Sequence, residues 1–173
     1  MIWRLPIATD DGEFIAWFSE SGLIRLDFPA DHLRKSPGQT SGTPASQEQH
    51  DWAQVTAAAL RHALDGRKPE ALPPLDWTGH TPFQQDVWRA MLRIAPGQTK
   101  TYAQIAAEVG EPKATRATGT ACGANPIPVL VPCHRVVAAN GGLGGFSGGL
   151  DWKRRLLGRE GVRLELTPQN GGQ

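Results

Sequence analysis

Cysteine is scarce in this chain of 173 residues, with Cys122 and Cys133 as the two examples and no CxxC pair. Two cysteines are too few for a disulfide framework, and without a closely spaced pair they do not indicate a zinc site. We therefore expect no metal and a reducing compartment, which is the cytoplasm, or the nucleus if the host is eukaryotic. Long apolar runs are also missing, so we expect neither a membrane span nor a signal peptide.

A large excess of charge is absent as well, since the formal net charge is +1. The charges are nevertheless unevenly distributed. Residues 1–78 contain seven Lys and Arg against eleven Asp and Glu, whereas residues 79–173 contain eleven against six. A basic half is typical of a surface that faces a polyanion, with nucleic acid as the leading candidate, although a few surface lysines would give the same count.

The first half of the chain predicts a small antiparallel sheet followed by one helix. Three short runs are separated by turn-forming residues and favour a meander: Ile2–Ile7, Glu13–Ser19 and Leu23–Phe28. Residues 35–46 are polar and rich in Gly, Ser, Thr and Pro, which predicts a loop. Ser46 is a suitable N-cap for the helix that follows. The prolines of residues 67–80 mark the expected boundary between two domains, 1–78 and 79–173.

The second half predicts a series of short helices. Thr81 with Gln84, and Thr101 with Gln104, have the spacing of the capping box that begins a helix. A further helical segment, from Lys113 to about Gly123, follows after a tight turn, and two short helices so joined indicate a helix-turn-helix.

The second helix of that pair is made almost wholly of small residues, from which Arg116 alone protrudes. Long side chains usually read base edges in the major groove, whereas small residues let a helix backbone approach a surface closely. Burial against neighbouring helices would explain the same composition. The position of this segment in a helix-turn-helix, within the basic half, favours contact with DNA.

Cys133 stands at the end of an apolar run and directly before His134 and Arg135. Cationic neighbours lower the pKa of a thiol and raise its thiolate fraction, so we expect Cys133 to be a reactive nucleophile. An inert core cysteine is the alternative for a lone cysteine in such a place. Cys122 has no neighbouring base and is expected to be structural.

Several motifs follow one another along residues 79–161: Thr81-Pro82-Phe83-Gln84, Val87-Trp88, Pro96-Gly97-Gln98, Thr101-Tyr102, Arg116-Ala117 with Gly119, Asn125-Pro126, Pro132-Cys133-His134-Arg135-Val136, Gly145-Phe146-Ser147-Gly148-Gly149, Lys153 and Glu160-Gly161. Together they closely resemble the O6-alkylguanine-DNA alkyltransferases, a family of direct-reversal DNA repair proteins. The resemblance implies a mixed α/β (α+β) fold. Residues 1–78 would form a small ribonuclease-H-like antiparallel-sheet domain, and residues 79–173 a mostly helical domain with a winged helix-turn-helix.

The activity implied by this resemblance is that of a methylated-DNA–protein-cysteine S-methyltransferase. Such a protein flips O6-alkylguanine out of double-stranded DNA, because the alkyl carbon cannot be reached inside the duplex. It would transfer the alkyl group irreversibly to Cys133, so that each molecule works once. No cofactor and no membrane would be involved, and a monomer is expected. The sequence leaves open whether O4-alkylthymine is a second substrate.

The resemblance also implies a role for each matching position of the catalytic site. Cys133 would accept the alkyl group, His134 would act as a general base through a water, and Glu160 would orient the histidine. Asn125 would hold the active-site turn together. Tyr102 would donate a hydrogen bond or proton to guanine N3 as the base leaves.

The implied substrate and DNA contacts form a second group. Ser147 would lie near guanine O6, and the main-chain carbonyls of Cys133 and Val136 would accept the exocyclic amine. Arg116 would fill the gap that the extruded nucleotide leaves. The remaining residues expected to contact DNA, mainly along the minor groove, are Thr115, Ala117, Thr118, Gly119 and Arg135.

Two other classes of function stay open at this point. An alkyltransferase-like binding protein would recognise the lesion without transfer, but that class replaces the acceptor cysteine, which is present here. An unrelated cysteine hydrolase would use Cys133 with His134, although adjacent residues rarely form a dyad.

Lys153-Arg154-Arg155 predicts either a solvated helix face or a phosphate contact. Residues 141–145, rich in glycine, predict a flexible loop over the active site.

Overall fold

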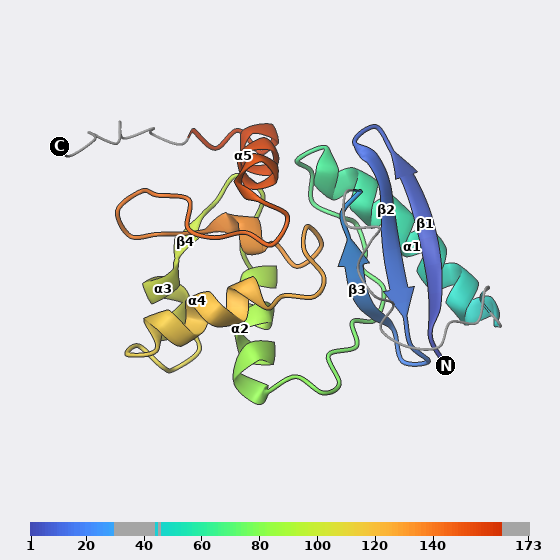
Figure 1. Ribbon diagram of the computed structural model, residues 1–173, viewed down its shortest axis with the longest axis horizontal. Coiled ribbons are helices and arrows are strands. Elements are labelled where there is room, and N and C mark those ends of the chain that lie inside the picture. Colours follow the sequence, from blue (N-terminus) through green and yellow to red (C-terminus); the bar gives the residue numbers. More distant parts are fainter. Residues whose placement is uncertain (30–43, 45, 164–173) are drawn as a thin grey trace.

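The computed structural model describes residues 1–29, 44 and 46–163, which form a sheet part and a helical part side by side (Figure 1). The sheet consists of β1 (Trp3–Thr9), β2 (Gly12–Phe18) and β3 (Leu23–Asp27), in the order β1-β2-β3 with antiparallel pairing. The predicted meander is therefore confirmed. Most of the predicted loop at residues 35–46 lies outside the described residues.

Helix α1 (Gln47–Leu64) runs across one face of this sheet (Figure 1). It begins where the sequence predicts, because the hydroxyl of Ser46 accepts a hydrogen bond of 3.2 Å from the amide of Gln49. Leu60 and Leu64 lie on its buried face. Residues 14–18 of β2 are all buried, as expected for a central strand that is covered on both sides.

The helical part contains α2 (Pro82–Leu92), α3 (Tyr102–Glu108), α4 (Thr115–Gly123) and α5 (Leu150–Arg159). Both predicted capping boxes are present, at the starts of α2 and α3. Helices α3 and α4 pack on each other as the predicted helix-turn-helix. Between α4 and α5 the chain forms the 3-10 helix η1 (Cys133–Arg135) and the short strand β5 (Val136–Val137), which pairs in parallel with β4 (Lys100–Thr101).

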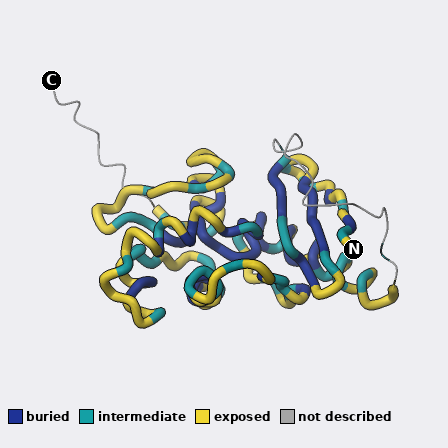
Figure 2. Tube along the Cα trace, turned by 60° about the horizontal axis from the view of Figure 1, so that its bottom comes forward, coloured by how far each residue is buried: buried dark blue, intermediate teal, exposed yellow. Residues whose placement is uncertain are grey.

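Both parts contribute to one buried hydrophobic cluster. In Figure 2 the buried segments gather in the middle of the helical part and along the strands, while the outer loops are exposed. Trp88 of α2 is fully buried, and its indole nitrogen donates to the carbonyl of Ala121 at 2.8 Å, which fixes α4 against α2.

The mixed α/β fold class is confirmed, whereas the domain boundary at residue 78 stays a prediction. No helix among the described residues is long and apolar enough to cross a membrane.

The end of α5 is attached directly to the sheet part. Arg159 donates two hydrogen bonds of 2.7 Å to the carboxylate of Asp11 in the β1–β2 turn, and a third, of 3.0 Å, to the carbonyl of Leu64. Gly66 lies against the main chain of the same residue, Arg159. Because Glu160 follows at once in the sequence, the sheet part helps to fix the position of that carboxylate.

A pair of glycine substitutions tests this contact. Gly66 (φ +74°) and Gly79 (φ +88°) are both left-handed, but a Cβ at 66 would overlap the carbonyl oxygen of Arg159, whereas a Cβ at 79 meets nothing within 4 Å. We expect Gly79→Ala to lower the free energy of unfolding by about 1 kcal/mol, the usual cost of left-handed backbone. Gly66→Ala should lower it by about 3 kcal/mol, because overpacking adds to that cost. Urea denaturation measures both values, and equal losses would contradict the contribution of the contact.

Candidate active site

Cys133 lies at the start of η1, at the end of a buried turn formed by residues 127–132. Its side chain is 5% exposed. The turn contains Val129 with φ 74°, the one non-glycine residue of positive φ in the described chain. Left-handed backbone is costly for a β-branched residue and persists where the surroundings over-determine it, as they often do at functional sites.

Asn125 connects this turn to the sulfur. Its side-chain nitrogen donates to the carbonyl of Val131 at 2.8 Å and to the sulfur of Cys133 at 3.2 Å. Its side-chain oxygen accepts from the amide of Ile127 at 3.0 Å. Asn125 is buried, and hydrogen bonds in a low-dielectric interior are stronger than at the surface. A single amide therefore holds both the turn and the thiol in place.

The thiol of Cys133 is not acidified by its neighbours in the sequence. Burial raises its pKa to about 11, and the hydrogen bond from Asn125 and the charge of Lys153 offset only part of this effect. The expectation of a lowered pKa is therefore wrong, because the side chains of His134 and Arg135 are directed to Glu160. In the free protein the thiol is protonated at neutral pH, and a nucleophilic role requires a base.

His134 is placed to be such a base. Its Nε2 atom lies 2.9 Å from Oε1 of Glu160, and both side chains are 1% exposed. Burial lowers the pKa of His134, which keeps the ring neutral near pH 7. Because a carboxylate only accepts hydrogen bonds, Nε2 must carry the ring proton and Nδ1 must be the acceptor. Nδ1 is buried and has no hydrogen-bond partner among the described residues, so the proton-accepting atom is available.

Arg135 keeps Glu160 charged. Its guanidinium donates to the two carboxylate oxygens at 2.8 to 3.1 Å and to the carbonyl of Ile94 at 2.6 Å. Burial alone would raise the pKa of Glu160, but the hydrogen bonds from His134 and Arg135 outweigh it and lower the pKa to about 2. This buried side chain is occupied inside the protein, and the expected contact of Arg135 with DNA stays a prediction.

Lys153 belongs to the motifs that carry the resemblance, but the sequence analysis assigned it no role at the site. It is fully buried, and its ammonium donates to the carbonyls of Val136 at 2.6 Å and Gly145 at 3.2 Å. Burial lowers its pKa to about 8. Helical spacing could have revealed it, since Lys153 precedes the buried Leu156 and Leu157 by three and four residues. The run 153–155 is therefore not a uniform solvated face.

Tyr102 lies between α4 and the glycine-rich loop. Gly119 of α4 packs beside its ring, and Gly144 passes so close that a Cβ there would overlap the hydroxyl. Burial raises the pKa of the Tyr102 phenol, and a negative charge on Cys133 would raise it further. The phenol is thus a proton donor rather than an anion at neutral pH, in the electrostatic neighbourhood of Cys133.

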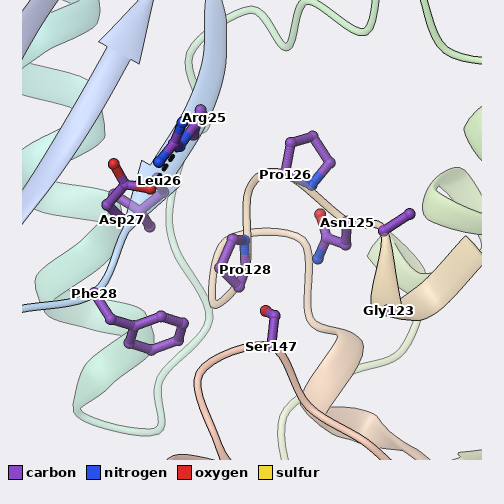
Figure 3. A pocket seen from close by; sticks show the side chains of 10 residues that line it. Arg25, Leu26, Asp27, Phe28, Gly123, Asn125, Pro126, Pro128 and Ser147 are labelled. Atoms are coloured by element: carbon purple, nitrogen blue, oxygen red, sulfur yellow. Dashed lines mark hydrogen bonds and ion pairs between the residues drawn. The ribbon is translucent and has the colours of Figure 1, made fainter. Parts of the chain in front are cut away.

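Helix α4 presents only part of the expected DNA-contacting set to solvent. Thr115, Arg116 and Ala117 are exposed, and Gly119 is half-buried. Thr118 is fully buried, and its expected place along the minor groove stays a prediction. Arg116 and Ala117 border an open groove of about 590 Å³ between α4 and the start of α2. Ser147 is exposed and lies at a cleft beside the Asn125 turn (Figure 3).

Comparisons with known proteins agree with this arrangement. The family described as "6-O-methylguanine DNA methyltransferase, DNA binding domain" matches residues 82–162. Mycobacterium tuberculosis OGT, solved in complex with DNA, is 34% identical to this chain, with a TM-score of 0.77 over 92% of this chain and 93% of that one. The chain belongs to the O6-methylguanine DNA methyltransferase family.

Other members of this family match over different lengths. The methylated-DNA–protein-cysteine methyltransferase of Salmonella typhimurium is 53% identical over 87 residues, which is 50% of this chain and 51% of that protein. The inducible enzyme of Bacillus subtilis is 42% identical over 110 residues, or 64% and 61%. The matches thus span about half to three-fifths of these curated relatives. The Pyrococcus kodakaraensis methyltransferase structure is 26% identical, with a TM-score of 0.63 over 94% of this chain and all of that one.

The buried carboxylate predicts a specific acid dependence of stability. The pKa of Glu160 is about 2 in the folded protein and near 4.5 when unperturbed, so its contribution is complete above pH 4.5 and is lost as the pH falls toward 2. Glu160→Gln removes this group, and we expect its free energy of unfolding to fall less steeply than that of the wild type across this window. Urea midpoints measured from pH 5 to 2.5 test this. Glu70→Gln, at an exposed site, controls for net charge, and parallel curves for Glu160→Gln and the wild type would refute the expectation.

Proposed function

We propose that this chain is a methylated-DNA–protein-cysteine S-methyltransferase that repairs O6-alkylguanine in double-stranded DNA by transferring the alkyl group to Cys133. One observation carries the proposal: the thiol is buried and protonated, beside a buried histidine whose free nitrogen can accept a proton. Such a thiol is suited to a substrate that brings its reactive carbon into the interior. The exposed small-residue face of α4 supports a DNA substrate.

The first step is removal of the thiol proton. The Nδ1 atom of His134 takes the proton from Cys133 through a water, and Glu160 stabilises the imidazolium that forms. Arg135 keeps the carboxylate ionised for this purpose. Asn125 donates to the sulfur and stabilises the negative charge on it, as does the ammonium of Lys153.

Alkyl transfer follows at the flipped nucleotide. The thiolate sulfur forms a bond to the alkyl carbon, the bond from that carbon to O6 breaks, and the electron pair leaves with guanine. Tyr102 protonates guanine N3 as this charge develops. Ser147 and the carbonyls of Cys133 and Val136 are proposed to hold the base. The Val136 carbonyl already accepts from Lys153, so its remaining lone pair would serve the exocyclic amine. The product is a thioether without a route to hydrolysis, which makes the reaction stoichiometric.

DNA is proposed to bind along α4 through the minor groove. Thr115, Ala117 and Gly119 allow close approach of the helix, and Arg116 enters the base stack in place of the extruded nucleotide. We further propose that the protein acts as a monomer in the compartment that holds the DNA, the cytoplasm of a bacterium or the nucleus of a eukaryote. O4-alkylthymine is a candidate second substrate.

A label-transfer experiment tests the proposed activity. Duplex DNA carrying O6-methylguanine with a labelled methyl group is incubated with excess and with limiting protein. We expect the label to move to the protein and to stop at one equivalent, and we expect no transfer with Cys133→Ala. Cys122→Ala serves as the matched thiol control and should keep the one-equivalent limit.

Two other results would contradict the proposed activity and favour another function. Tight binding of the lesion without transfer would identify an alkyltransferase-like binding protein. Sustained turnover of an ester or amide that depends on Cys133 would identify a cysteine hydrolase.

The role of Arg116 gives a separate prediction. Arg116→Ala should slow transfer from duplex DNA by about tenfold, equivalent to about 1.4 kcal/mol, because the extruded state loses its filling side chain. Transfer from free O6-methylguanine should change little, since no stack has to be opened. Rates on both substrates measure this, with the exposed Arg4→Ala on β1 of the sheet part as the control. Similar losses on both substrates would exclude the stack-filling role.

A further inference from the structure

Phe28 is the side chain through which the sheet part reaches the loop of the active site. It follows β3 directly and is 3% exposed. Its ring packs against the main chain at Gly148, where a Cβ would lie 2.6 Å from the ring (Figure 3, where the ring is directed toward the segment that carries Ser147). Phe14 and Trp152 support the ring, with centroids 5.5 Å and 5.0 Å away. The sheet part therefore holds this segment with a ring that is itself well packed.

Phe146 extends this contact to the histidine of the site. Its ring meets the ring of Phe28 edge-on, with 5.8 Å between centroids and 75° between the ring planes. It also lies 6.4 Å from the ring of His134, at an interplanar angle of 83°. Both separations lie within the range of about 4.5–7 Å over which aromatic rings attract each other. A continuous series of ring contacts thus connects the sheet part to His134.

The main chain on both sides of Phe146 limits the movement of its ring. The amide of Gly149 donates to the carbonyl of Phe146 at 3.0 Å, which closes a turn. The carbonyl of Gly145 accepts from the ammonium of Lys153 at 3.2 Å. With Phe28 against the same turn, the ring of Phe146 is held in its position beside the histidine.

The protonation state of His134 depends on how far water reaches its ring. The ring is 1% exposed, and Nδ1 has no hydrogen-bond partner among the described residues. Burial is the largest effect that lowers the pKa of His134; Arg135 and Lys153 lower it further, whereas Glu160 raises it. Water around the ring would solvate the imidazolium and raise this pKa toward its ordinary value of 6.5. A protonated ring could not accept the proton of Cys133.

We propose that Phe28 and Phe146 form a ring pair that keeps bulk water away from His134, and that Phe28 is thereby a positioning residue for the general base. This inference rests on the alkyl-transfer function proposed above, which assigns His134 the role of base. The ring pair is in place before DNA binds, so its effect belongs to the free protein. It makes the lower pH limit of the reaction depend on a contact between the sheet part and the helical part.

Three single substitutions separate the ring pair from the rest of the core. Phe146→Ala removes the ring beside His134 from a half-buried loop position, at the border of the hydrophobic cluster. Phe28→Leu replaces the ring that supports Phe146 with a shorter apolar side chain. Phe18→Leu is the matched control, because Phe18 is also buried in the sheet part but stacks on Trp3.

The first measurement is the pKa of His134 in the free protein, followed by NMR through the Cε1 signal of its ring. The signal is assigned by its loss in His134→Gln. We expect Phe146→Ala to raise this pKa toward 6.5 and Phe28→Leu to raise it less, because water then reaches the ring. Phe18→Leu should leave the pKa of His134 as in the wild type. This measurement requires neither DNA nor activity.

The second measurement is the second-order rate constant of methyl transfer from duplex DNA between pH 5.5 and 7.5. This constant reports the ionisation of groups in the free protein. A histidine that titrates near 6.5 is neutral in only about one tenth of the molecules at pH 5.5. The rate constant of Phe146→Ala relative to the wild type should therefore fall by up to about tenfold from pH 7.5 to pH 5.5. The same ratio for Phe18→Leu should not depend on pH.

The possible failures are distinguishable. An unchanged pKa of His134 in Phe146→Ala would overturn the inference, and an unchanged value in Phe28→Leu would remove Phe28 from it. Slowing by the same factor at every pH would also overturn it, since a merely structural role predicts that result. So would an equal rise of the pKa in Phe18→Leu. Absence of methyl transfer in the wild-type protein would instead refute the proposed function, while the NMR titration would still decide whether the rings shield His134.

Discussion

The site depends on one buried carboxylate, that of Glu160. Its two oxygens are shared between the ring of His134 and the guanidinium of Arg135, and without these partners a buried charge would be too costly to keep. The arrangement fixes the histidine tautomer and thereby leaves Nδ1 as the acceptor. It also ties α5 to η1, so that the helix and the thiol-bearing turn cannot move independently. Removal of this carboxylate would leave Arg135 and His134 without compensation in the interior.

The sheet part contributes to this site although none of the proposed catalytic groups lies in it. Asp11 binds the side chain of Arg159, the residue before Glu160, and Gly66 packs against the main chain of Arg159. On the other side, Phe28 holds the segment that carries Ser147. The sheet part thus supports two segments of the helical part that follow η1 in the chain. One carries Ser147, and the other is the end of α5. This explains why one hydrophobic cluster extends through both parts rather than two separate cores.

Local sequence patterns predicted the helices and strands well. They did not predict contacts between side chains that are far apart in the sequence. The helix starts at Ser46, Thr81 and Thr101 depend on residues three positions apart, so local sequence was sufficient. The environment of Cys133 was mispredicted because adjacency in sequence does not give the direction of a side chain, and Arg135 turns away to Glu160, 25 residues later. The buried position of Lys153 was not predicted because charged side chains are rarely buried, and its carbonyl partners belong to other segments. Motif resemblance supplied the grouping of Cys133, His134, Asn125 and Glu160 that composition and periodicity could not.

The high pKa of Cys133 has a consequence for the proposed reaction, in which each molecule would work once. The thiol is 5% exposed and carries its proton at neutral pH, whereas alkylating agents in solution react with accessible thiolates. A thiol that becomes nucleophilic only with a base bound beside it is protected from these reagents. The burial that weakens the nucleophile would therefore preserve each molecule for the proposed transfer.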